Sequence, residues 1–220
     1  TAIDYITIAT TGNAADFGDL TVGRRVTAVS DGTYAAFAGD STTIDYITVA
    51  STGNATDFGD LLNSPYQFGG WSDATRGVYA GGLTSGGSTN VVQYITIASP
   101  SNATDFGDLI ANNRDNGACG DTTRGVVCGG EVSGSGVNQL QYFTTQTLGN
   151  ATDFGDLTGT TTNPAATSNA TRAVVHMGKK DGSWSNSNTQ DYFTIQTLGN
   201  ASTFGNVTTN NNNACAATSG

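Results

Sequence analysis

The most restrictive feature of this sequence is a nine-residue string that occurs five times. The string reads GNATDFGDL at 53–61 and returns as NATDFGDL at 102–109 and GNATDFGDL at 149–157, with altered copies GNAADFGDL at 12–20 and GNASTFGNV at 199–207. Its phenylalanine recurs at spacings of 41, 48, 48 and 50 residues, and an upstream tyrosine recurs at the same spacings. A fixed period of this length is the signature of a repeat architecture. The chain is therefore a tandem array with about 48 residues per unit.

Each unit has the same four parts, and each part predicts one short β-strand. A β-branched and aromatic segment such as IDYITV (44–49) comes first, and the string follows with a short strand around its phenylalanine. A stretch of small residues comes third, at 24–30, 68–72, 116–120 and 165–168. The fourth part is an apolar segment that ends at a glycine break, at 32–40, 75–82, 123–130 and 171–178. Four short strands per unit are typical of the blade of a β-propeller, whose blades must stack to bury their faces.

We therefore expect an all-β chain, folded as a β-propeller of about five four-stranded blades. The whole chain, 1–220, is one repeat domain with units at roughly 21–61, 62–109, 110–157 and 158–208 and partial units at 1–20 and 209–220. Strands from the N- and C-terminal partial units would close the ring and remove its open sheet edges. That shared blade would be one strand short, so a longer parent array is the alternative.

The composition excludes several classes of partner. The net charge is −10 and nearly all the acidic residues are Asp, whereas nucleic-acid binding requires clustered Lys and Arg. The charge also disfavours an anionic membrane surface, and no apolar run approaches the roughly 18 residues of a membrane span. We expect no nucleic-acid partner and no membrane insertion.

The repeated string supports two interpretations, a metal site and a scaffold element. Asn54, Asp57 and Asp60 would offer oxygen ligands to Ca²⁺ in every unit. However, the last copy loses both carboxylates and keeps Phe204 and Gly205. Asn and Asp also hold turns, and Phe and Leu fill cores, so the string is predicted to be scaffold with no metal and no cofactor. Its N-x-T/S triplets are read as turns that match a glycosylation motif by coincidence.

The arginines and cysteines are also given structural interpretations. Arg76, Arg124 and Arg172 recur in TRG or TRA, and we expect each to tie a turn by binding carbonyl groups or an Asp such as Asp57, Asp105 or Asp153. The three cysteines, Cys119, Cys128 and Cys215, have no metal-type spacing and are predicted to be small buried groups.

Nothing in the sequence indicates an enzyme. The single histidine, His176, lies in the apolar segment AVVHMG, and no G-x-S-x-G elbow occurs. A Ser-His-Asp or Cys-His arrangement requires a histidine aligned with a nucleophile, and a lone histidine in a strand is more often a packed residue. We expect a non-enzymatic protein.

The repeat resembles two kinds of known sequence. The segment VYAGG (78–82), the strand VVQY (91–94) and Phe106 take the places of the double glycine, tyrosine and tryptophan of the kelch repeat, with Phe in place of Trp. The wording DYITIATTGN, DFGDL and TRGV is similar to repeat-rich tail and fibre proteins of marine bacteriophages, especially the cyanophage type. These resemblances imply kelch-like blades and a place in a virion.

The segments that vary between units are the candidate recognition surface, because loops on a rigid scaffold often carry function. The stretches 62–71 and 179–188 contain aromatic and basic residues that predict ligand contact: Tyr66, Phe68, Trp71, Lys179, Lys180 and Trp184. Packing between blades or subunits is the alternative for these side chains.

We expect a structural or host-recognition component of a phage virion, with other virion proteins or a host-surface glycan or protein as partners and a possible homo-oligomer. The alternative function is a secreted carbohydrate-binding propeller with repeated sites.

Overall fold

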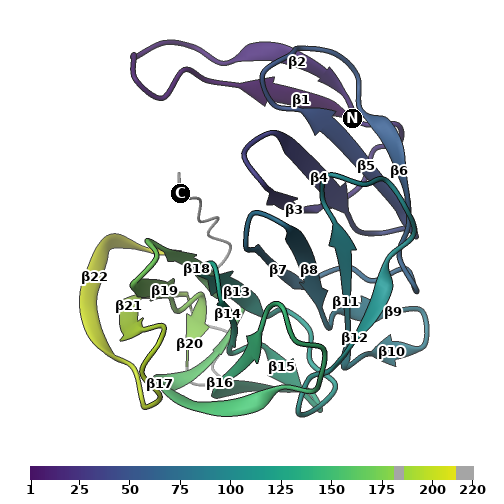
Figure 1. Cartoon of the computed structure of the whole chain (residues 1–220). Helices are drawn as coiled ribbons and strands as arrows, with labels where there is room; N and C mark the ends of the chain where they lie inside the picture. Colours follow the sequence, from purple (N-terminus) through teal and green to yellow (C-terminus); the bar gives the residue numbers. More distant parts are fainter. Residues whose placement is uncertain (181–185, 212–220) are drawn as a thin grey trace.

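The computed structural model describes residues 1–180 and 186–211, and in this part every regular element is a β-strand. Figure 1 shows small twisted sheets that follow one another around an arc, in the order of the chain. None of the described residues belongs to a helix that could cross a bilayer. The prediction of an all-β, propeller-like chain is confirmed for these residues.

Four complete antiparallel blades make up most of the arc, and each has its strands in chain order from the inside outward. The first two blades contain β3 (Thr27–Ser30), β4 (Tyr34–Ala38), β5 (Thr43–Thr48) and β6 (Thr56–Asp60), then β7 (Gly69–Ser72), β8 (Arg76–Ala80), β11 (Val91–Thr96) and β12 (Thr104–Asp108). The last two contain β13 (Gly117–Gly120), β14 (Arg124–Cys128), β16 (Ser135–Thr144) and β17 (Thr152–Thr162), then β18 (Ala165–Ser168), β19 (Arg172–His176), β21 (Ser187–Thr194) and β22 (Ser202–Asn211).

Short accessory strands decorate the blades. A separate hairpin joins β9 (Leu83–Thr84) and β10 (Gly87–Ser88), and β15 (Glu131–Val132) pairs with β16. The two-residue β20 (Lys179–Lys180) pairs with β17 of the preceding blade, so the third and fourth blades also share backbone hydrogen bonds.

The innermost strands are made of small residues because the blades converge there. β13 contacts both β7 and β18, and β7 also contacts β3, so these strands line the inside of the arc (Figure 1). A Cβ added at Gly69 would stand 2.8 Å from the Cβ of Ala118 in the next blade. The large exception is Trp71 of β7, which lies against Gly125 of β14 in the next blade, where an added Cβ would overlap the indole. The small-residue stretches therefore allow neighbouring sheets to approach.

The count of blades differs from the expected five. The strands β1 (Ala2–Tyr5) and β2 (Ala15–Asp19) pair only with each other and are the counterparts of the two outer strands of a blade. Figure 1 shows this hairpin and the sheet of β22 at the two ends of an open arc. The described residues thus form four blades and half of a further one. Ring closure, and the C-terminal strand expected beyond residue 211, lie outside what they show.

Each copy of the string forms a β-bulge with its phenylalanine as the extra residue. In the first blade Ile44 pairs with Gly59 and Asp45 pairs with Asp57, which leaves Phe58 without an opposite residue. The same shift occurs in the three later blades and in the N-terminal hairpin. A bulge bends the strand and redirects the side chain. Here it turns the phenylalanine toward the next blade.

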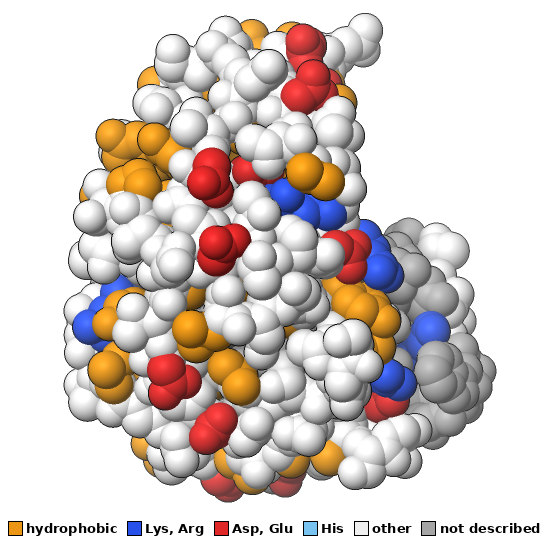
Figure 2. All heavy atoms as spheres, turned by 90° about the vertical axis from the view of Figure 1, so that its right-hand side faces the viewer, with side chains coloured by type: hydrophobic (Ala, Val, Ile, Leu, Met, Phe, Trp, Pro, Cys, Tyr) orange, Lys and Arg blue, Asp and Glu red, His pale blue; other side chains and the backbone are white. Residues whose placement is uncertain are grey.

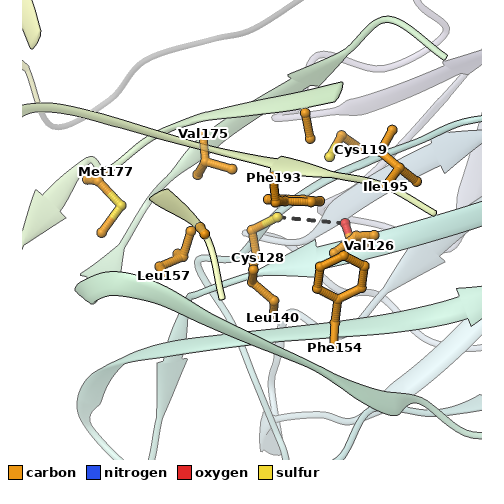
Figure 3. Close-up of a cluster of buried hydrophobic side chains, with 12 residues drawn as sticks. Cys119, Val126, Cys128, Leu140, Phe154, Leu157, Val175, Met177, Phe193 and Ile195 are labelled. Atoms are coloured by element: carbon orange, nitrogen blue, oxygen red, sulfur yellow. Dashed lines mark hydrogen bonds between the residues drawn. The ribbon is translucent and has the colours of Figure 1, made fainter. Parts of the chain in front are cut away.

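The core lies between blades rather than within them. The cluster in Figure 3 joins Cys128, Leu140 and Phe154 from the third blade with Val175 and Phe193 from the fourth. Four of the five string phenylalanines are buried as expected, with exposed fractions of 7% or less, whereas Phe204 at the end of the array is 53% exposed. A blade therefore buries its string phenylalanine only when another blade follows.

Candidate functional site: the blade seams and the inner rim

The string is a fastener between consecutive blades. We call its Gly-Asn-Ala part the head and its Phe-Gly-Asp part the tail, and the contact between two blades a seam. At the first seam Gly53 donates its N–H to Phe17 O at 2.7 Å, and Ala55 donates to Asp19 O at 2.8 Å. The Asn54 side-chain oxygen accepts the N–H of Asp19 at 3.0 Å. The head of one copy thus binds the tail of the preceding copy.

The three later seams repeat this arrangement. Asn102, Asn150 and Asn200 each accept the N–H of the Asp in the preceding tail at 3.0 Å. In every case the following alanine donates its N–H to the carbonyl of that same Asp at 2.8 Å. Because each copy has both halves, one short sequence can join any number of blades head to tail.

Glycine in the tail is required by the head that packs on it. A Cβ at Gly18, Gly59, Gly107 or Gly155 would stand 2.3 to 2.5 Å from the carbonyl oxygen that opens the next head. At Gly205, in the last copy, no atom of the described residues lies within 4 Å of an added Cβ. The glycine that recurs in the string is therefore required by backbone contact between blades.

Two of the three proposed calcium ligands have scaffold roles in the structure. The side-chain oxygen of Asn54 accepts a backbone N–H, and Asp60 uses its backbone N–H and carbonyl to hold the next head. Asp57 is exposed. In the described part of the chain, no three His, Cys, Asp or Glu side chains are grouped as a metal site.

A second seam contact lies four residues after each string phenylalanine. Thr21 donates its N–H and hydroxyl to the carboxylate of Asp45 in the next blade, and Thr158 does the same to Asp191. Where the residue is apolar, the partner is a glutamine: Leu62 donates its N–H to Gln93, and Ile110 donates its N–H to Gln141. These four acceptors are 0 to 1% exposed. Thr is thus matched with Asp, and Leu or Ile with Gln.

The recurring arginines cross the seams as well. Arg76 lies over the ring of Tyr94 in its own blade and donates to the carbonyl of Thr145 in the next, at 2.9 Å. Arg124 lies over Tyr142 and donates to the carbonyl of Ile195 at 2.8 Å. The prediction of carbonyl partners is confirmed for these two, but the carbonyls belong to the next blade and not to a local turn. Among the described residues no ion pair joins these arginines to Asp57, Asp105 or Asp153.

An aspartate three residues before Arg76 and before Arg124 makes a second contact with the next blade. We call the arginine and aspartate contacts together the arginine latch. Asp73 and Asp121 cap the turns that precede Arg76 and Arg124, and their second oxygens accept the amides of Gln146 and Gln196 from the following blades, at 2.5 and 2.6 Å. Partial burial opposes ionisation of Asp121. The hydrogen bonds from Gln196, Thr123 and Arg124 outweigh it, so the pKa of Asp121 is lowered.

The residues that differ between blades gather on an inner rim. This rim consists of the segments that enter β3, β7, β13 and β18, together with those that leave β4, β8, β14 and β19. Backbone bonds link it from blade to blade: Asp40 N–H to Pro65 O, Gly82 N–H to Asn113 O and Gly130 N–H to Thr161 O. The scaffold therefore holds variable side chains in equivalent, fixed places.

Three equivalent rim residues, one in each of the segments that enter β7, β13 and β18, adopt left-handed backbone conformations that are uncommon outside glycine. Gln67, Asp115 and Asn163 have φ of 59°, 53° and 53° and are spaced by 48 residues. Asp115 donates its N–H to Gln67 O, and Asn163 donates its N–H to Asp115 O. Such conformations cost of order 1–3 kcal/mol and persist where the surroundings fix them. The hydrogen-bonded chain of rim peptides provides that constraint.

The position eight residues after each string phenylalanine changes its chemistry from blade to blade. It holds Arg25, Tyr66, Arg114 and Thr162. Arg25 pairs with Asp40, and these hydrogen bonds lower the pKa of the carboxyl; the Arg25 guanidinium also lies 4.4 Å from the centre of the Tyr66 ring. Arg114 pairs with Glu131, which is 4% exposed.

A charged cluster sits at the rim of the third blade. Burial raises the pKa of Asp115, and the negative charge of Glu131 adds to this effect, while the positive charges of Arg114 and Lys179 oppose it. Arg25, Arg114, Asp115 and Glu131 are rim residues that the sequence alone does not single out. Arg25 and Arg114 share a distance of eight residues from the string phenylalanine, but nothing in the local sequence marks that position as part of a rim.

The predicted ligand residues separate into two groups. Phe68 and Trp71 are 6% and 4% exposed and pack in seams, and Trp71 stacks on Phe143 and donates its indole N–H to Thr145. For Phe68 and Trp71 the structure agrees with packing, the alternative interpretation that the sequence left open. Tyr66 and Lys179 lie half-buried at the rim, with Lys180 beside Lys179 in β20. Trp184 lies outside the described residues.

His176, Cys119 and Cys128 are buried. His176 is 7% exposed and lies within β19. Cys119 and Cys128 are free and buried, as predicted, and the neighbouring thiol of Cys119 together with burial raises the pKa of Cys128. Cys215 lies outside the described residues.

The face of the molecule in Figure 2 carries its charge in dispersed form. On the face in Figure 2, Asp and Glu side chains stand in small separate groups among uncharged atoms, and the apolar side chains form small separated areas. This face offers no large single-sign or apolar patch, so the rim remains the better candidate for recognition.

Comparison with known proteins adds no family to this description. No protein-family model matches the chain, and a search of curated proteins found no significant match.

Proposed function

We propose that the protein is a non-enzymatic structural or host-recognition component of a phage virion, which displays the inner rim on a stiff propeller. The observation that carries the proposal is a division of labour between residue positions. Positions that repeat, in the string and in the arginine latch, are used in contacts between blades. Positions that vary, at the rim, present different side chains in equivalent places.

A rigid scaffold with variable display sites suits recognition of a large partner. The partner would be another virion protein or a glycan or protein of the host surface. The association with virions, and with kelch-like phage tail or fibre proteins, rests on the sequence resemblance alone. We place the protein on the extracellular particle.

We further propose that the ring has five blades and closes through the two ends of the chain. The support is the half blade β1–β2, which has the outer strands of a blade and lacks inner ones. Small-angle X-ray scattering of the full chain tests this proposal. A closed ring is more compact than the arc of Figure 1, and scattering that fits the arc alone contradicts closure.

The virion role is tested by immunogold labelling of intact particles with antibodies raised against the full chain. Regular label at the tail or an appendage is the expected outcome. Antibody that labels only unassembled material, with no label on purified particles, contradicts the proposal.

A secreted carbohydrate-binding propeller is the second candidate. Tyr66 favours it, because a half-buried tyrosine at the rim, with Arg25 over one face of its ring, combines apolar area with a polar hydroxyl that a sugar can contact. A glycan array separates the two functions. Binding of a free saccharide that is lost in Tyr66→Ala favours the lectin when it is kept in Leu83→Ala, the control at the half-buried residue whose backbone pairs with Tyr66. No binding, together with label on particles, favours the virion component.

A further inference from the structure

The two ends of the arc carry complementary halves of the contacts that join the internal blades. At the C-terminal end, the tail Phe204–Gly205–Asn206 has no head packed on it: Phe204 is 53% exposed and Gly205 has nothing within 4 Å of an added Cβ. At the N-terminal end, the head Gly12–Asn13–Ala14 is exposed, whereas the equivalent Ala55 and Ala103 are buried. Each end thus presents what the other would bind.

The matched pairs four residues after the phenylalanine point to the same partner. The residue in this place after Phe204 is Thr208, and in the internal seams Thr is matched with Asp, never with Gln. The N-terminal hairpin carries Asp4 in the acceptor place and not Gln. Asp4 is exposed, whereas its counterparts Asp45 and Asp191 are 0% exposed. Thr208 and Asp4 would therefore form a further Thr–Asp pair of the kind seen in the internal seams.

The arginine latch supplies a third complementary contact. Arg76 and Arg124 bind the carbonyl three residues after the strand tyrosine of the next blade. Arg172 lies over Tyr192 in the same way but is exposed. The carbonyl in the corresponding place of the N-terminal hairpin belongs to Ile8, whose side chain is 83% exposed.

We infer that the N-terminal hairpin β1–β2 of the same chain docks on the exposed face of β22 by the same fastener that joins the internal blades. In this seam Asn13 accepts the N–H of Asn206, Asp4 accepts the N–H and hydroxyl of Thr208, and Arg172 donates to the carbonyl of Ile8. The inference rests on the proposed closure and adds the residues that make it. Because the ends stand apart in Figure 1, the arc tightens as the seam forms.

Alanine at Gly205 is the first test, because this position is open in the arc and crowded in the seam. If the head at Gly12 covers Gly205, the Cβ of Gly205→Ala would meet a backbone carbonyl. The Cβ of Gly155→Ala would meet Gly199 O at 2.5 Å in the same way. Gly199→Ala is the matched control, with a similar φ and nothing within 4 Å. We expect the Tm of Gly205→Ala to fall nearly as far as that of Gly155→Ala. A fall no larger than that of Gly199→Ala overturns the inference.

A compensating exchange is the second test. Thr208→Leu and Asp4→Gln alone each mismatch the pair, and together they recreate the pair seen in Leu62 and Gln93. We expect each single variant to lower Tm and the double variant to recover most of the loss. Residues at opposite ends of an open arc do not interact, so strictly additive shifts overturn the inference.

Light scattering after gel filtration, over a range of protein concentrations, assigns the seam to one chain or to two. We expect a monomer whose Tm is independent of concentration. An oligomer that Gly205→Ala dissociates shows that the hairpin of a second copy occupies β22 and overturns the assignment to the same chain. If scattering shows a closed ring while Gly205→Ala behaves like Gly199→Ala, closure stands and the proposed seam fails.

Discussion

A single absent Cβ decides whether two neighbouring blades can touch. In the string the tail glycine has its Cα hydrogen directed at the carbonyl of the next head, and any side chain would displace that head. Glycine also accepts the positive φ of this position, which is 144° at Gly107. Both requirements act on the same residue in four copies, whereas Gly205 in the last copy has the positive φ alone, 155°.

The first prediction compares two glycines from one seam. Gly107→Ala would place a Cβ 2.3 Å from Gly149 O, whereas Gly149→Ala has a similar φ and nothing within 4 Å. We expect Gly107→Ala to lower the free energy of unfolding by about 1–3 kcal/mol more than Gly149→Ala, the usual cost of overpacking. Urea denaturation measures the difference. Equal losses would show that φ alone requires glycine here.

The second prediction concerns the carboxylate of Asp121. Its pKa is lowered in the folded chain, so its ionised form stabilises the fold above the unfolded pKa of about 3.9, and this contribution is lost as pH falls through the folded pKa. Asn169 occupies the equivalent place and caps the same turn, so Asp121→Asn keeps the turn. We expect wild type to be more stable than Asp121→Asn at pH 6 and the difference to shrink below about pH 4. A constant difference from pH 6 to 2.5 in urea denaturation would contradict this role.

At the scale of the element, the latch between blades matters more than an ion pair at the rim. Arg76 is partly buried, covers Tyr94 and satisfies a carbonyl of the next blade. Arg25 has similar partners, Tyr66 and Asp40, but its side chain is 68% exposed. Solvent screens the exposed pair, and a hydrogen bond from a charged group to a buried partner is the stronger contact.

The third prediction follows from that difference. Arg76→Ala removes a stacked cation and leaves the carbonyl of Thr145 without this donor, so we expect a loss of about 2 kcal/mol in the free energy of unfolding. Arg25→Ala is the control and should lose less than about 1 kcal/mol. Chemical denaturation of the two variants side by side makes the comparison. A larger loss for Arg25→Ala would show that the rim, and not the seam, carries the stability.

At the scale of the whole molecule, stability is distributed over the seams. Each seam buries side chains from two blades, as Trp71 of the second blade stacks on Phe143 of the third. A single four-stranded blade leaves one face uncovered, and its stability depends on its neighbours. The blades are therefore coupled units, and a loss at one seam weakens those beside it.

The fourth prediction is that the chain unfolds in one cooperative transition. Because every described blade shares a core with a neighbour, no blade can unfold alone without exposing an apolar seam. Differential scanning calorimetry should give a calorimetric enthalpy equal to the van't Hoff enthalpy. Two resolved transitions would show that at least one seam is too weak to couple its blades.

The sequence by itself determined the repeat, the strands and their order. Period, β-branched residues and glycine breaks are local signals, and the parts that they predict at 165–168 and 171–178 contain β18 and β19. The burial of the string phenylalanine also followed, because an aromatic residue that recurs in every unit of a mostly polar string requires a common core. Asn54 was recognised as a scaffold residue, but its partner was placed in a local turn and not in the preceding blade.

Only the tertiary structure decided which blade each repeated residue serves. The partners of Asn54, Arg76 and Thr158 lie 35, 69 and 33 residues away in sequence, and no local pattern encodes such a pairing. The same holds for exposure: Phe154 and Phe204 stand in nearly the same local sequence, and one is buried while the other is exposed, because burial depends on whether a blade follows. Local chemistry specifies a blade, whereas the contacts that specify the assembly arise only when two blades meet.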